Sequence, residues 1–127
     1  LSRICAPLMV ESTGSGAILN ISSIAGHKPT PCFSAYGTAK GALSMLTQEL
    51  AQEFAPKVRV NAIAPSLALH PFLHKVTSKE LLAELEAKEA FGRGSEVWEQ
   101  ANVMVFLASD YSSYMTGEVI STSSQRA

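Results

Sequence analysis

Several features that would assign the chain to a particular class of protein are scarce or missing. Its 127 residues include two cysteines that stand far apart and form no Cys-x-x-Cys pair, Cys5 and Cys32. A disulfide scaffold is therefore not expected. The two thiols are expected to be reduced, as in a cytoplasmic protein. The longest unbroken apolar run covers 103–108, far short of the roughly 20 residues that cross a bilayer. The opening residues show no signal-peptide pattern, so no membrane partner is predicted.

A dominant charge of one sign is also lacking. Ten Lys and Arg residues stand against eleven Asp and Glu residues, which gives a net charge of −1 with no basic cluster. Nucleic-acid binding needs a face that neutralises phosphates and is therefore not predicted. The hydrophobic fraction of 46% excludes a disordered chain and suits one packed domain of this length.

Short apolar runs alternate with segments of helical periodicity. The runs predicted to be strands, the first of them buried on both faces, are 17–22, 58–64 and 118–122. A loop is expected over 23–34, and the predicted helices cover 1–11, 35–54, 71–76, 78–90 and 96–108. Strand, helix, strand, helix, strand is the order of a parallel α/β sheet.

This order predicts where a site would lie. In a right-handed βαβ unit the two strands point the same way and the connecting helix runs back. The ends of both strands and the start of the helix therefore meet at one edge of the sheet, which is where open α/β sheets bind ligands. Three segments are expected at that edge: 22–23, 36–40 and 65–66.

The residue types in these segments suit proton transfer. Tyr36 and Lys40 stand four positions apart and share a helix face, so a phenol and an ammonium lie close together. A phenol is a weak base at neutral pH, and a nearby cation stabilises its deprotonated form. Ser23 could hold a substrate oxygen in place. Taken alone, such a pair is more often a solvated helix face and such a serine a turn residue, and it is their convergence that favours catalysis.

Three motifs stand in these segments: Asn-Ile-Ser-Ser at 20–23, Tyr-Gly-Thr-Ala-Lys at 36–40 and Val-Arg-Val-Asn-Ala-Ile-Ala-Pro at 58–65. They closely resemble those of the short-chain dehydrogenase/reductase family. Tyr-x-x-x-Lys alone is weak, but the serine 13 positions before the tyrosine and the strand after it make the match strong. The resemblance covers essentially the whole chain and the second half of the family's domain.

The resemblance implies an α/β fold, the carboxyl-terminal half of a Rossmann-type doubly wound parallel sheet, with three strands and flanking helices. Residues 1–127 would form a single partial NAD(P)-binding domain that lacks the glycine-rich amino-terminal half and is inactive alone. The start at Leu1 suggests a piece of a longer protein. The implied activity is that of an oxidoreductase that uses NAD or NADP to interconvert a carbonyl and a secondary alcohol.

Carried over by position, the family's catalytic roles fall on three residues. Tyr36 would be the acid/base, Lys40 would bind the nicotinamide ribose and favour the tyrosinate, and Ser23, rather than Ser22, would bind the substrate oxygen. The expected cofactor contacts are Tyr36, Lys40, Pro65, Ser66, Leu67 and His70.

The chain departs from the family's pattern after two of its strands. Ser66 replaces the glycine of Pro-Gly, and Thr-Ser-Ser at 122–124 replaces Asp-Gly-Gly. His70 stands where the family usually has threonine. His70 and His74 are four positions apart, but no third ligand has a recognisable spacing, so no metal site is predicted. His27 is expected in the loop after Ser23, with a substrate-lining role as the less favoured alternative.

The substrate is expected to be a small molecule with a bulky apolar body, such as a 3-oxoacyl thioester or a ring ketone. The stretch 67–73 and the leucines of the expected helix 78–90 would line such a site, or would only anchor that segment to its own protein. By the resemblance, helices 1–11 and 35–54 would join copies into a dimer or tetramer. The alternatives are a dehydratase or epimerase of the same family, and a catalytically silent fragment that serves as a subunit-contact module.

Overall fold

A computed structural model describes residues 1–125, apart from the side chain of residue 74. Its central sheet has three parallel strands in the order β1-β2-β5. These strands are β1 (Gly16–Ile21), β2 (Val58–Pro65) and β5 (Val119–Thr122), close to the predicted positions. The mixed α/β architecture expected from the sequence is confirmed.

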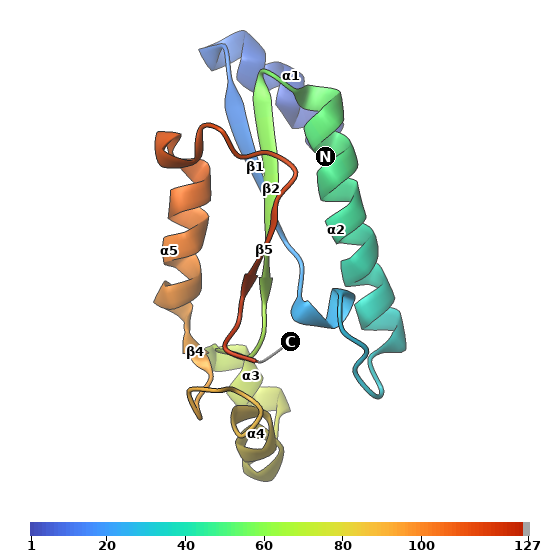
Figure 1. Ribbon diagram of the computed structural model, residues 1–127, viewed down its shortest axis with the longest axis vertical. Helices are drawn as coiled ribbons and strands as arrows, with labels where there is room; N and C mark the ends of the chain where they lie inside the picture. The colour runs from blue at the N-terminus through green and yellow to red at the C-terminus, as the bar shows by residue number, and fades with distance from the viewer. Residues whose placement is uncertain (126–127) are drawn as a thin grey trace.

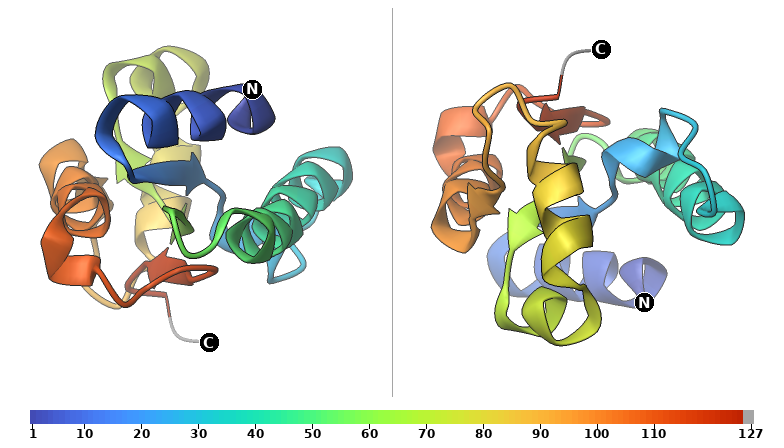
Figure 2. Two further views of the ribbon diagram at one scale, coloured as in Figure 1. Left: turned by 90° about the horizontal axis from the view of Figure 1, so that it is seen from above. Right: turned by 90° about the horizontal axis from the view of Figure 1, so that it is seen from below.

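Helices cover both faces of this sheet. Figure 1 and Figure 2 show α2 (Ser34–Phe54) on one side and α5 (Val97–Ala108) on the other. The first helix, α1 (Ser2–Thr13), lies beside β1 and packs its Ala6 against a core formed with α2 and β2. None of the helices over 1–125 is long and apolar enough to cross a membrane.

The strands differ in burial because of their positions in the sheet. The middle strand, β2, is buried along most of its length, as its run of valine, alanine and isoleucine suggests. The residues of β1 are only half-buried or exposed, so the prediction that this strand is buried on both faces was wrong. Within the described residues β1 pairs only with β2, which leaves it at an edge.

The segment beyond the strand ends was predicted less well. The helix expected over 78–90 is shorter, because α4 (Lys79–Glu86) ends four residues earlier. It follows α3 (Pro71–Val76), and Figure 1 shows both helices beyond the carboxyl ends of the strands. The short parallel pair of β3 (Ala68–Leu69) and β4 (Ser95–Glu96) was not predicted, since two residues carry no periodicity.

Close backbone contacts fix the loop after β1. Its short 3-10 helix, η1 (Ile24–Gly26), lies against α2 at glycines. A Cβ atom on Gly37 would lie 2.7 Å from the carbonyl oxygen of Ala25, and one on Gly41 would lie 3.0 Å from that of Gly26. These α2 glycines therefore allow the loop to approach the helix closely. A second short 3-10 helix, η2 (Asp110–Ser112), follows α5.

Candidate functional site

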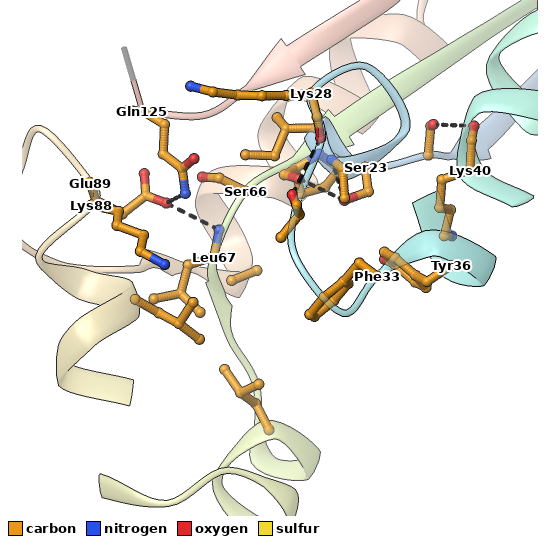
Figure 3. Close-up of a pocket in the computed structure, with 18 of the residues that line it drawn as sticks. Ser23, Lys28, Phe33, Tyr36, Lys40, Ser66, Leu67, Lys88, Glu89 and Gln125 are labelled. Atoms are coloured by element: carbon orange, nitrogen blue, oxygen red, sulfur yellow. Dashed lines mark hydrogen bonds between the residues drawn. The ribbon is translucent and has the colours of Figure 1, made fainter. Parts of the chain in front are cut away.

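A cavity of about 840 Å³ opens at the carboxyl edge of the sheet, within the usual size range of small-molecule sites. Every residue that the sequence nominated for catalysis or cofactor binding lines it: Ser23, Tyr36, Lys40, Pro65, Ser66, Leu67 and His70. Figure 3 shows Tyr36 and Lys40 on one side, Glu89 and Gln125 on the other, and Ser23 and Ser66 between them. The topology thus brings together segments that are far apart in the chain.

Tyr36 and Lys40 lie in the first turns of α2. The Nζ atom of Lys40 is 5.6 Å from the centre of the Tyr36 ring, so a positive charge stands beside the phenol. That Nζ atom also donates a hydrogen bond of 2.7 Å to the backbone oxygen of Ile21, at the end of β1. The edge of Phe33 packs against the Tyr36 ring, which remains 46% exposed and is accessible from the cavity.

The two adjacent serines after β1 have different surroundings. The hydroxyl of Ser22 donates a bond of 2.9 Å to the backbone oxygen of Lys40 and lies 2.7 Å from the hydroxyl of Ser44. The residue is 2% exposed. Ser22 therefore ties β1 to α2. The Oγ atom of Ser23 accepts a bond from the backbone N–H of Ala25 at 3.2 Å and contacts the Pro65 oxygen at 3.5 Å. Ser23 thus stands between the two strand ends, at the wall of the cavity.

The side chains of His70 and His27 each contact a helix of the protein, α3 and α2 respectively. The Nδ1 atom of His70 caps α3 by accepting a bond of 3.1 Å from the N–H of Leu73, and its ring stacks on Phe72. His27 lies 3.0 Å from the hydroxyl of Ser44 and lines a separate cavity between η1 and α2. Its placement supports the loop interpretation over a substrate-lining role. The residues that the structure describes contain no group of three potential metal ligands.

Glu89 is the member of the cavity wall that sequence reasoning missed. It lies after α4, it is 5% exposed, and its carboxylate accepts several hydrogen bonds. Burial raises the pKa of Glu89, but hydrogen bonds from Ser124, Gln125, Ser66 and the backbone N–H of Leu67 outweigh it and leave the pKa below its usual value. In the expected helix 78–90, Glu89 stands four positions after Leu85, on the face of the leucines, and this was the sequence signal for its burial.

The remaining charged groups of the cavity are positive. Lys28 and Lys88 line it along with Lys40, and Figure 3 shows them on either side of the pair formed by Glu89 and Gln125. Three lysines stand against the single carboxylate of Glu89, so the lining of the cavity carries a net positive charge. The charge of the cavity therefore favours an anionic group on a ligand.

Comparisons with known proteins agree with this architecture. A family profile described as enoyl-(acyl carrier protein) reductase matches residues 1–124. Over 116 residues the chain is 51% identical to a Mycobacterium tuberculosis protein, covering 91% of this chain and 44% of that protein. That protein is named (5R,7aS)-5-hydroxy-7a-methyl-1-oxo-2,3,5,6,7,7a-hexahydro-1H-indene-carboxyl-CoA reductase.

Two solved structures share the fold. One is a 3-oxoacyl-[acyl-carrier protein] reductase from Brucella melitensis, with a TM-score of 0.85 and 34% identity over 95% of this chain and 45% of that one. The other is a 7α-hydroxysteroid dehydrogenase complexed with NADH and 7-oxo glycochenodeoxycholic acid. Its TM-score is 0.88 at 30% identity, over 97% of this chain and 48% of that one. The chain spans about half the length of the relatives it matches, and it belongs to the short-chain dehydrogenase/reductase family.

Proposed function

We propose that this chain carries the catalytic groups of an NAD(P)-dependent oxidoreductase that interconverts a carbonyl and a secondary alcohol. The observation that supports it best is the meeting of Tyr36, Lys40 and Ser23 around one cavity at the edge where such sheets bind ligands. We further propose that residues 1–127 form the second half of a single NAD(P)-binding domain, since their relatives extend to about twice this length.

The residues present fit a nicotinamide cofactor. Lys40 offers an ammonium at the end of β1, where it could meet ribose hydroxyls, and the segment 65–67 offers backbone groups in the same cavity. His70 completes the nominated contacts. The structure of the related steroid dehydrogenase contains NADH, and we propose either NAD or NADP as the cofactor here. When bound, the cofactor supplies the hydride.

The chain's own residues would handle the proton. In the reducing direction the hydroxyl of Tyr36 would donate its proton to the substrate oxygen. Ser23 holds that oxygen by a hydrogen bond from its hydroxyl. The ammonium of Lys40, close to the Tyr36 ring, stabilises the phenolate that forms.

For the substrate we propose an apolar ring ketone or 3-oxoacyl thioester. The cavity wall contains apolar side chains from four segments, namely Ile24, Phe33, Leu67, Leu73 and Leu85. Leu69, Phe72, Leu81 and Leu82, which the sequence also suggested for this wall, do not line the cavity. The compound in the name of the indene-carboxyl-CoA reductase combines a ring system with a CoA thioester. The ammonium group of Lys88, in the wall of the cavity, would suit the phosphates of such a thioester.

We also propose a cytoplasmic homo-oligomer, either a dimer or a tetramer. The outer faces of α1 and α2 expose large apolar side chains, including Ile4, Leu8, Met45 and Leu46. A second copy of the protein would cover them, whether the chain is an active enzyme or only a contact module. Sedimentation of the full-length protein as a stable monomer at micromolar concentration would contradict this part.

The test of the proposed activity is a comparison of substrates with full-length enzyme. A 3-oxoacyl-CoA, an apolar ring ketone and a sugar alcohol are each assayed with NAD(H) and NADP(H) by the absorbance of the reduced cofactor. We expect kcat/KM to be highest for the CoA thioester or the ring ketone. A clearly higher kcat/KM for the sugar alcohol would overturn the substrate class. Product analysis showing loss of water or epimerisation without net redox change would favour the dehydratase or epimerase alternative.

A further inference from the structure

Two of the places where the sequence departs from the pattern of the family it resembles lie close together in space. Ser66 follows β2 and Ser124 follows β5, and by that resemblance each replaces a glycine. The hydroxyl of Ser124 donates a bond of 2.7 Å to the Oε2 atom of Glu89, and the Ser66 side chain is close enough to this carboxylate to help lower its pKa. Glycine has no hydroxyl for such a bond, so the two departures and Glu89 form one arrangement.

The carboxylate of Glu89 is saturated with donors. Its Oε1 atom accepts from the N–H of Leu67 at 3.3 Å and from the Nε2 atom of Gln125 at 2.9 Å. Its Oε2 atom accepts from the N–H of Ser124 at 3.3 Å, in addition to the serine hydroxyl. A carboxylate offers about four lone-pair sites, so Glu89 has no capacity left to act as a base toward a substrate. We call the Glu89 carboxylate and its donors, Leu67, Ser124 and Gln125, the clamp.

The clamp joins the end of β2 to the segment after β5, on the side of the cavity opposite Tyr36 (Figure 3). The N–H of Ala90, next to Glu89, reinforces it by donating a bond of 3.1 Å to the backbone oxygen of Ser124. The held stretch 65–67 contains Pro65, whose oxygen contacts Ser23. The wall that Glu89 fixes is therefore continuous with the serine proposed to hold the substrate oxygen.

We infer that Glu89 is a positioning residue, which holds Ser66, Leu67 and Gln125 as a preformed wall and so governs binding of substrate and cofactor more than proton transfer. This inference rests on the proposed function, because its consequences are read in the binding of the reactants. A wall that is ordered before binding reduces the entropy lost when a ligand is bound. Loss of the clamp should therefore appear mainly in KM.

Glu89→Gln in the full-length protein is the test. An amide keeps the shape but replaces one acceptor oxygen with a donor, which faces donors already present, so the wall loosens. We expect KM for substrate and Kd for cofactor to rise about tenfold while kcat changes by less than about threefold. Glu84→Gln, on the exposed side of α4, is the matched control and should leave all three unchanged. Glu89→Asp should recover part of the binding.

A second measurement does not depend on turnover. Hydrogen exchange of the N–H groups of Leu67 and Ser124 should become about tenfold faster in Glu89→Gln, and less so in Ser124→Ala, which removes one donor and keeps the charge. Unchanged exchange and unchanged KM, with kcat retained, would overturn the inference. A fall in kcat at constant KM would also overturn it. An inactive wild type would contradict the proposed function instead, and exchange at these two positions would then decide the inference alone.

Discussion

Replacing Lys40 with methionine removes an ammonium that has two separate contacts. Its Nζ atom lies 5.6 Å from the centre of the Tyr36 ring and 2.7 Å from the backbone oxygen of Ile21. Methionine keeps the length and apolar stem of the side chain while removing the charge. Ile21 is 41% exposed and is the last residue of β1, so water can replace the lost hydrogen bond to its backbone oxygen. We expect the Tm to change little.

The catalytic effect follows from the charge. Two unit charges about 5–6 Å apart, the scale given by the distance from Nζ to the ring centre, interact by about 3 kcal/mol at an effective dielectric constant of about 20. Tyr36 is 46% exposed, so solvent screens the interaction and about 1–2 kcal/mol remains for stabilising the phenolate. That corresponds to a fall of about 5–30-fold in kcat. Cofactor affinity should fall as well, because the same ammonium is proposed to meet the ribose.

The assay is steady-state turnover and cofactor titration of full-length Lys40→Met, with Lys79→Met on α4 as the matched control. Lys40→Arg retains the charge and should keep more of the turnover than Lys40→Met. The reasoning would be refuted if Lys40→Met matched wild type in both kcat and cofactor affinity while it remained folded.

Three further outcomes follow from the same structure. Ser22→Ala should lower stability by about 1–2 kcal/mol, measured by urea unfolding, with little change in kcat, because it removes buried bonds that join β1 to α2. Ser23→Ala should lower kcat far more than Ser22→Ala does, and equal effects on kcat would contradict the distinction. Gly37→Ala should lower the Tm by several degrees, because its Cβ would lie 2.7 Å from the Ala25 oxygen, and an unchanged Tm would show that η1 yields freely. The pKa of Glu89 in the folded protein lies below its ordinary 4.5, so Glu89 contributes stability above pH 4.5 that is lost as the pH falls through the lower folded value. Between pH 3 and pH 7 the free energy of unfolding should therefore depend more strongly on pH in wild type than in Glu89→Gln, and identical slopes would contradict the clamp.

The strands and long helices could be predicted from sequence because their signals are local. The apolar run of β2 and the helical spacing of α2 each determine an element within the segment itself. The alternation of these elements then implies that the strand ends and the start of the helix meet at one edge of the sheet. For this reason the sequence alone predicted that Ser23, Tyr36 and Lys40 lie together. The half-burial of β1 is a property of the whole sheet and has no local signal.

Glu89 could not be found in the same way. Its burial depends on donors that stand 22 positions before it at Leu67 and 35 positions after it at Ser124. Residues 87–90 still fitted a helical pattern although α4 ends at Glu86, so Glu89 was expected inside a helix and was given no role. The departures at Ser66 and Ser124 were visible in the sequence, but their partner was not.

Turnover of Tyr36→Phe in the full-length protein tests the central claim most directly. Phenylalanine keeps the ring that packs against Phe33 and removes only the hydroxyl that is proposed to transfer the proton. We expect kcat to fall by about 10²–10⁴-fold while cofactor affinity stays within about twofold of wild type. Wild-type turnover in a folded Tyr36→Phe protein would contradict the assignment of Tyr36 as the acid/base.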